Sequence, residues 1–406
     1  MSASRARFHA AQARAYRKLD NPPEMELDAW LDSNDQIRQK LVVQLDQTDN
    51  PLDIEYLEFS LQELGKRRER IIFLFENQRE YELLDIFADV LNRDLEFVAE
   101  AAERMGHSTD QTLVIGTFPT GSINAKVLPV DDTADSRERY IVVDSGLPTF
   151  ANLLAKAVTN AVPCFRRPDN SEPDYLNDIA LVEREIMKDP QAVVTRYAEL
   201  IQSYVANGDP NAAPRYLVSP DSVVISGRWL SSIEQFIVAH EYAHVVRGVM
   251  PKIVEDDSVR QAFARAIEAE LSRFDELESD QLAMNIVIEA YRQRFTDFEY
   301  VNKFVIFPIF VMFYALSDLQ WAVDSILSGT HRENGPPKDS HPPPIDRLEA
   351  LFKWLVEDYV KTDSAKASIQ HSYDLAHKIM GYYGGMAQSM VAVAIERGIP
   401  VHPRWQ

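Results

Sequence analysis

The sequence contains a single cysteine, Cys164, among its 406 residues. This excludes an internal disulfide framework and is typical of a reducing compartment. Long apolar runs are absent as well: the most hydrophobic stretch, residues 304–316, is too short to span a bilayer and predicts a buried core helix. The basic N-terminal segment has no apolar core, so we expect no export signal. We therefore expect a cytoplasmic protein without a membrane span, in which Cys164 is a small packing residue.

Positive charge is scarce relative to negative charge. The chain has 42 Lys and Arg residues against 63 Asp and Glu residues, which gives a formal net charge of −21. Such acidity disfavours nonspecific binding to nucleic acid or to an anionic membrane surface. It is compatible with a cationic protein substrate, and it leaves the oligomeric state open.

The most informative residues that are present occupy positions 240–244, which read His-Glu-Tyr-Ala-His. Two histidines four positions apart lie on one face of a helix, where both imidazoles can bind one Zn²⁺. His240 and His244 are therefore candidate zinc ligands. Glu241 is the candidate general base, because it flanks the metal and can deprotonate a zinc-bound water. Two core histidines with ordinary partners are the alternative.

The flanking residues predict a helix from about Ser231 to Gly248. Ser231 precedes Glu234 by three positions, which is the spacing of a capping box, and Gly248 is a typical helix terminator. Before this helix we expect a surface loop over residues 207–221 and a short strand over residues 223–225.

A second helical stretch, residues 258–292, supplies carboxylates. Zinc sites with two histidines and one carboxylate take the carboxylate from another helix, and an outer carboxylate orients a ligand histidine. Glu276 and Asp280 share a helix face and fit these two roles, respectively. Glu278 competes for the ligand role, and an exposed charged helix face is the alternative reading.

A third element, Ser-His-Pro-Pro-Pro-Ile-Asp-Arg-Leu, occupies residues 340–348. The prolines hold the chain extended, and a helix is expected to start near Ile345. His341, held in this way, is a candidate donor to the oxyanion of a tetrahedral intermediate. A proline-rich connector with an incidental histidine is the alternative.

In this order, the three motifs resemble those of gluzincin metallopeptidases of the CAAX prenyl protease and heat-shock membrane protease type, and of the soluble phage-exclusion proteases. The resemblance covers residues 112–352. It implies that the zinc ligands, with the carboxylate that orients one of them, are His240, His244, Glu276 and Asp280. It implies that the catalytic groups are Glu241, His341 and Arg347. Ser279 stands where the family has alanine, and we expect this difference to be harmless.

Strand-like runs are few, at residues 112–115, 123–130 and 140–143. We predict an α+β fold that is mostly helical, with a gluzincin-like catalytic core and a small sheet, flanked by helical regions. The predicted regions are a helical N-terminal region that is either a partner-binding module or a layer packed on the core, a zinc peptidase core, and a C-terminal helical region interrupted by the glycines at 381–385. Their bounds are 1–110, 111–352 and 353–406.

These observations together predict a zinc-dependent endopeptidase that hydrolyses an intracellular protein through a zinc-bound water activated by Glu241. We expect narrow specificity, in a toxin-like or phage-defence role, because a broadly active protease would damage its own cell. A housekeeping peptidase is the alternative within this class. A zinc hydrolase of non-peptide substrates, or a zinc-containing binding or sensor protein without catalysis, is compatible with the same residues.

Overall fold

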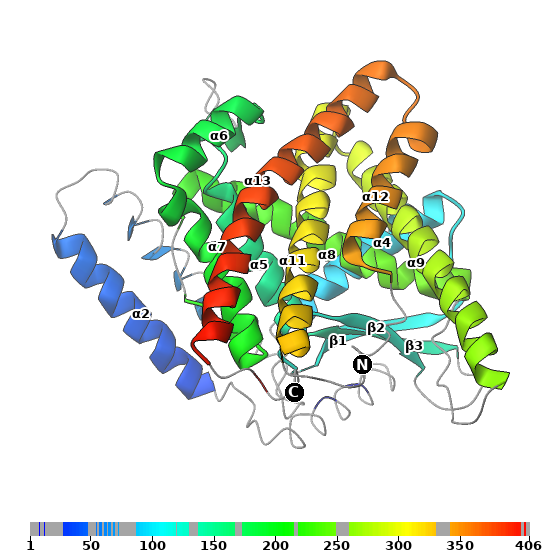
Figure 1. Ribbon diagram of the computed structural model, residues 1–406, viewed down its shortest axis with the longest axis horizontal. Helices are drawn as coiled ribbons and strands as arrows, with labels where there is room; N and C mark the ends of the chain where they lie inside the picture. Colours follow the sequence, from blue (N-terminus) through cyan, green and yellow to red (C-terminus); the bar gives the residue numbers. More distant parts are fainter. Residues whose placement is uncertain are drawn as a thin grey trace. The chain divides into compact units, whose positions relative to one another are not determined.

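The computed structural model describes residues 27–47, 87–118, 120–129, 137–166, 173–214, 218–248, 260–329 and 342–398, with isolated residues between 8 and 72 and at 402. This part of the chain is mostly helical and contains a three-stranded and a two-stranded sheet (Figure 1). The fold prediction is confirmed at this level, as α+β and mostly helical. The chain forms two compact units, which are described separately.

The first unit comprises Met1–Asn92, Thr112–Pro119 and Leu128–Val143. It contains helix α2 (Leu27–Gln47) and most of a sheet whose strands are β1 (Thr112–Phe118), β2 (Ala125–Pro129) and β3 (Glu138–Asp144). The strand order is β1-β3-β2, so the last strand in sequence is central. Aromatic and aliphatic side chains form the core of this unit: Phe8, Val114, Tyr140 and Val142 are buried and pack with Phe118 and Leu128. The three predicted strands are confirmed to within a few residues.

The second unit comprises Arg93–Gln111, Thr120–Val127 and Asp144–Gln406, and is built from helices. Its larger helices are α5 (Gly146–Thr159), α7 (Pro190–Asn207), α8 (Pro220–Arg247), α9 (Arg260–Arg292), α11 (Phe307–Gly329), α12 (Pro344–Trp354) and α13 (Asp363–Glu396). The smaller elements are α6 (Ile179–Lys188), α10 (Phe298–Val301), the hairpin of β4 (Cys164–Arg166) with β5 (Pro173–Tyr175), and single turns at Pro210–Ala212, Asn302–Ile306 and Leu355–Tyr359. Helix α4 (Ala88–Arg104) continues from the first unit into the second.

The apolar stretch predicted as a core helix forms the start of α11 and the π-helical turn before it. Most side chains from Val301 to Ala315 are fully buried, as expected. The continuous helical stretch Phe298–Ile326 is long and apolar enough to cross a membrane by length and composition, but 67% of its most apolar window is buried inside the protein. Because a buried core helix passes the same test, this is only a weak indication of a membrane span.

Helix α8 begins much earlier than the sequence suggests. Pro220 is its first residue, and the Oγ atom of Ser219 caps it by accepting a hydrogen bond from the Ser222 backbone N–H at 3.2 Å. The predicted start at Ser231 and the predicted strand at 223–225 are both wrong. A short run of β-branched residues is compatible with either structure, and here the cap and the buried helix face decide. The expected end is confirmed, since Gly248 terminates α8 with a φ of 69°.

Helix α13 runs without a break through the glycines at 381–385, so the predicted interruption is wrong. At Gly384, a Cβ atom would lie 2.6 Å from the Oδ1 atom of Asp318 on α11. The neighbouring Tyr383 is fully buried, and its hydroxyl donates to the Ala157 carbonyl on α5 at 2.7 Å. The glycine therefore serves close helix packing, and this outweighs its poor helix propensity.

Cys164 is half-buried in β4, and the Ser222 hydroxyl lies 3.5 Å from its sulfur. Burial raises the pKa of its thiol, against the opposing effect of the hydrogen bond from Ser222. A raised pKa leaves little thiolate at neutral pH, which agrees with a packing residue and not with a nucleophile.

Candidate metal centre

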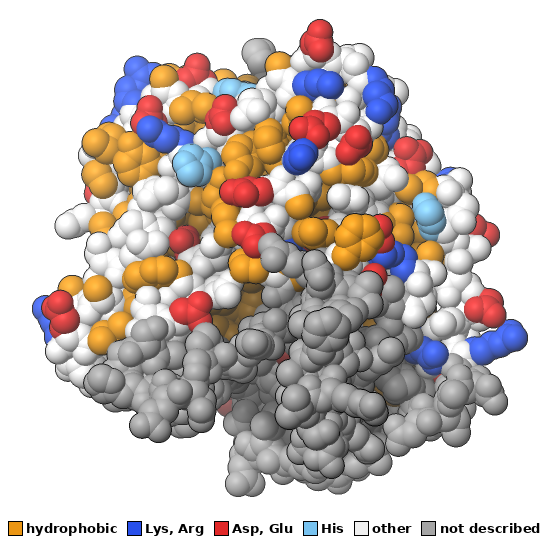
Figure 2. Space-filling view, turned by 45° about the vertical axis from the view of Figure 1, so that its right-hand side comes forward, with side chains coloured by type: hydrophobic (Ala, Val, Ile, Leu, Met, Phe, Trp, Pro, Cys, Tyr) orange, Lys and Arg blue, Asp and Glu red, His pale blue; other side chains and the backbone are white. Residues whose placement is uncertain are grey.

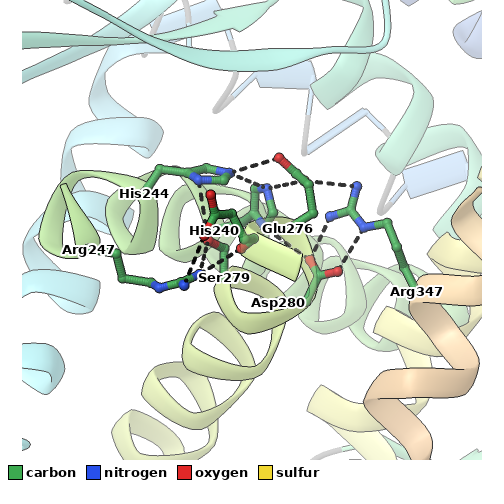
Figure 3. Close-up of polar contacts among 8 residues, drawn as sticks. His240, His244, Arg247, Glu276, Ser279, Asp280 and Arg347 are labelled. Atoms are coloured by element: carbon green, nitrogen blue, oxygen red, sulfur yellow. Dashed lines mark hydrogen bonds and ion pairs between the residues drawn. The ribbon is translucent and has the colours of Figure 1, made fainter. Parts of the chain in front are cut away.

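Three helices of the second unit bring the predicted site residues together (Figure 3). Helix α8 carries His240, Glu241 and His244 in its last two turns. Helix α9 carries Glu276 and Asp280, and α12 carries Arg347 in its first turn. Close packing of α9 on α8 and of α12 on α9 accounts for this convergence of residues that are far apart in the sequence.

The inner part of the site consists of His240, His244 and Glu276. The two Nε2 atoms lie 3.0 Å apart. Each Nε2 atom lies 3.3 Å from a different carboxylate oxygen of Glu276. Within the part of the chain that the structure describes, this is the one group of three or more His, Cys, Asp or Glu side chains with ligand atoms within 4.8 Å of one another.

These separations suit a zinc ion. Ligand atoms about 2.0–2.1 Å from a tetrahedral zinc lie roughly 3.3 Å from one another, close to the observed 3.0 and 3.3 Å. Imidazole nitrogens that keep their lone pairs, and carboxylate oxygens, are all acceptors, so their convergence needs a cation or a shared proton at the centre. Two imidazoles and one carboxylate are also the donor set of many catalytic zinc sites.

Asp280 holds the far nitrogen of His240. Its Oδ1 atom lies 2.9 Å from the Nδ1 atom of His240, and only 1% of its side chain is exposed. Arg347 binds the same carboxylate through two hydrogen bonds, from Nε to Oδ2 at 2.7 Å and from Nη2 to Oδ1 at 2.6 Å. A third nitrogen of Arg347, Nη1, lies 3.6 Å from Oε2 of Glu276. Arg347 thus anchors both Asp280 and Glu276.

Electrostatics follows from this arrangement. Burial lowers the pKa of His240, but its contacts with Asp280 and Glu276 outweigh burial and raise that pKa to about 10. Burial also tends to raise the pKa of Asp280, whereas Arg347 and His240 hold it below its usual range. In the metal-free protein, His240 is therefore a positively charged imidazolium at neutral pH, with a proton on each ring nitrogen. A metal ion that binds Nε2 would have to displace the proton on that nitrogen.

The far nitrogen of His244 has a different partner, which the sequence analysis missed. The Oγ atom of Ser279 lies 3.3 Å from the Nδ1 atom of His244 and accepts a hydrogen bond from Nη1 of Arg247 at 3.2 Å. Ser279 is fully buried. The expectation that serine at this position is harmless therefore overlooked a contact with a candidate ligand. One signal was available: Ser279 is three positions after Glu276, on the same side of α9.

Glu276 and Glu278 occupy different environments. Glu276 exposes 6% of its side chain and faces the histidines. Glu278 exposes 40% and forms an ion pair with Arg247. Two residues separated by two positions point to nearly opposite sides of a helix, so only one of them can face His240 and His244.

The remaining candidates are Glu241 and His341. Glu241 is buried. Burial lowers the pKa of Arg347, but the negative charges of Asp280, Glu276 and Glu241 outweigh this effect and raise it, with Asp280 contributing most. His341 lies outside the described residues. The helix that follows it begins at Pro344, one residue before the predicted start.

Comparison of the chain with protein-family models, with curated proteins and with solved structures finds no match. Only the geometry and chemistry of the site therefore indicate what the protein does.

Proposed function

We propose that this protein is a zinc-dependent endopeptidase with a gluzincin-like catalytic core. The observation that carries the proposal is the convergence of His240, His244 and Glu276, whose ligand atoms lie within 4.8 Å of one another on two packed helices. The buried carboxylate of Asp280 behind His240 adds the outer partner that zinc-binding histidines commonly have.

Each residue has a defined task in this mechanism. Zinc, when bound, would act as a Lewis acid that polarises a carbonyl and lowers the pKa of a bound water to about 7. Glu241 follows His240 on α8, and its carboxylate accepts a proton from water and later returns it to the leaving amine. Asp280 accepts a hydrogen bond from Nδ1 of His240, which keeps the lone pair on Nε2. Arg347 keeps Asp280 ionised and correctly oriented.

The number of ligands favours catalysis over a purely structural zinc site. Structural zinc sites are closed by four protein ligands, whereas catalytic sites use three and keep one position open. Among the described residues, the cluster has three members. A zinc-containing binding or sensor protein is therefore the weaker candidate, and a zinc hydrolase of another substrate class remains an outcome of the test below.

The substrate that we propose is an intracellular protein cleaved with narrow specificity in the cytoplasm, in a toxin-like or phage-defence role. The net charge of −21 favours a substrate with cationic segments. On the part of the face in Figure 2 that is coloured by residue type, acidic and basic side chains are interspersed with apolar ones, so no single-sign field covers that part. Recognition would then depend on local contacts near the site.

The test compares wild type with Glu241→Gln after zinc-replete expression. Elemental analysis should give one zinc per chain for both proteins. Incubation with a cell lysate, followed by mass spectrometry of new N-termini, should yield cleavage products with wild type. The variant should lose about 100-fold or more of the rate, because an amide cannot accept the proton. Glu185→Gln, on α6 and away from the site, is the matched control and should cleave like wild type.

Three outcomes would contradict the proposal. A wild-type protein without zinc after zinc-replete expression rules out a zinc enzyme. A zinc-loaded protein that generates no new termini favours the sensor class or a non-peptide substrate. Cleavage at an unchanged rate by Glu241→Gln excludes this residue as the base.

A further inference from the structure

Ser279 is a fully buried serine on the helix that carries the candidate carboxylate ligand. Its hydroxyl oxygen lies between two groups of α8, 3.3 Å from Nδ1 of His244 and 3.2 Å from Nη1 of Arg247. The buried hydroxyl of Ser279 on α9 therefore connects two residues of α8, the candidate ligand His244 and the cation Arg247.

Arg247 is itself held in place by α9. Its Nη1 atom donates to the Asp275 carbonyl oxygen at 2.6 Å, and its Nη2 atom contacts the carboxylates of Asp275, at 3.3 Å, and of Glu278. These contacts fix the guanidinium, so the direction from which it donates to Ser279 is fixed too. In the view of Figure 3, Arg247 and Arg347 flank the cluster on opposite sides.

We propose that Ser279 and Arg247 are positioning residues for His244, and that they set how tightly the site holds zinc. The proposal rests on the zinc site described above. The hydroxyl of Ser279 accepts the Nδ1 proton of His244, which leaves the Nε2 lone pair for the metal ion. Arg247 donates a hydrogen bond to the other lone pair of the same oxygen and so fixes the position of that oxygen.

The chemical class of the partner distinguishes this contact from that of His240. A carboxylate is a strong, charged acceptor, whereas a hydroxyl tied to a guanidinium is a neutral and weaker one. Because the oxygen of Ser279 already accepts a hydrogen bond from the Arg247 cation, it is a weaker acceptor for a second donor. His244 is therefore the more weakly supported ligand of the two, and its imidazole tautomer depends on Ser279.

The first experiment measures zinc affinity by competition with a chromophoric chelator. Ser279→Ala removes only the hydroxyl, and we expect about a tenfold loss, the low end of what outer partners contribute. Ser232→Ala is the matched control, because Ser232 is a fully buried serine of α8 whose hydroxyl donates to the Phe304 carbonyl at 2.7 Å. It should bind zinc within twofold of wild type. Equal affinities of the two serine variants, or no loss for Ser279→Ala, would overturn the proposal.

The second experiment does not need zinc. In chelator-treated protein labelled with ¹⁵N-histidine, the Nδ1 and Nε2 chemical shifts report which nitrogen carries a proton. Ser279→Ala should change the shifts of His244 and leave those of His240 in place, whereas Ser232→Ala should change neither. If wild type binds no zinc, the proposed function fails while this measurement still decides the Ser279 contact. Unchanged His244 shifts in Ser279→Ala would overturn it.

Discussion

The two histidines of the candidate site are four positions apart on one helix but are supported in different ways. Behind His240 lies Asp280, a carboxylate with 1% of its side chain exposed that binds Arg347 bidentately. Behind His244 lies the hydroxyl of Ser279, held by Arg247. Arg247 also pairs with side chains that are 28% and 40% exposed, so this side reaches solvent.

This difference shows that equal spacing along a helix does not make two ligands equivalent. The partner of each Nδ1 atom sets the tautomer and the electron density at the Nε2 atom that would bind the metal. His240 is supported by a buried carboxylate, and His244 by a neutral hydroxyl whose own partner, Arg247, belongs to a network that reaches solvent. Variants on each side of the site test this asymmetry.

The largest effect on zinc affinity is expected from removal of a ligand. His240→Ala and His244→Ala should each lower zinc affinity by more than the roughly 10–100-fold that an outer partner contributes. In metal-free protein the two should differ, because His240→Ala leaves the buried Asp280 carboxylate without one of its donors and costs about 1–3 kcal/mol. His244→Ala should cost less, since Ser279 keeps its bond with Arg247. Urea unfolding after chelator treatment measures both, and equal destabilisation would contradict the asymmetry.

Loss of the carboxylate behind His240 should come next. Asp280→Ala leaves the Arg347 guanidinium buried without its bidentate partner, and the expected cost is about 3–5 kcal/mol. Asp280→Asn keeps the shape and one acceptor, so it should fold but bind zinc about 100-fold more weakly, the high end of what outer partners contribute. A chelator competition that gives Asp280→Asn the same affinity as Ser279→Ala would remove the distinction between the two sides.

The pH dependence of stability should change sign when the metal is removed. In metal-free protein the pKa of His240 is raised to about 10. Its ion pairs therefore contribute stability that is fully present below the unfolded-state pKa of about 6.5 and is lost as the pH rises towards 10. Zinc-loaded protein should instead lose stability as the pH falls, because protons compete for the ligand. Unfolding at pH 6 and pH 9, with and without chelator, measures both slopes; parallel slopes would contradict the role of His240.

The smallest effect is expected at Glu278. Glu278→Gln weakens an ion pair with Arg247 that is partly solvent-exposed, and such pairs contribute about 0–1 kcal/mol. Zinc affinity should stay within a few-fold of wild type, whereas Glu276→Gln should reduce it strongly. A strong loss in the Glu278 variant together with a weak one in the Glu276 variant would reverse the assignment of the ligand.

Much of the candidate site follows from helix periodicity alone. The spacing of His240 with His244, and of Glu276 with Asp280, predicts that each pair shares a helix face, as the structure has it. The same periodicity places Ser279 on the face of Glu276, but it does not show that Ser279 and Arg247 are partners of a ligand, because polar residues on a charged helix resemble solvent-exposed surface until the packing of α9 on α8 is known. The position of Arg347 was suggested only by resemblance, since its contact with Asp280 joins two distant segments.

The fold was predictable in its composition but not in its boundaries. Apolar runs indicated the strands around the core residues Val114 and Val142 and the buried helix α11. The start of α8 was missed because Ser219 and Pro220 lie in a stretch that is also typical of a loop. The continuity of α13 was missed because glycine disfavours helix locally, whereas its packing against another helix is a tertiary effect.

The close approach of Gly384 to Asp318 has a consequence for how the protein opens. Because a Cβ atom there would lie 2.6 Å from a carboxylate oxygen, any side chain at position 384 would push α13 away from α11. Since α13 and α11 pack closely at this point, the opening of one helix also exposes the facing side of the other. Backbone amides in the middle of both helices should then exchange their hydrogen for deuterium through the same opening event, with equal protection.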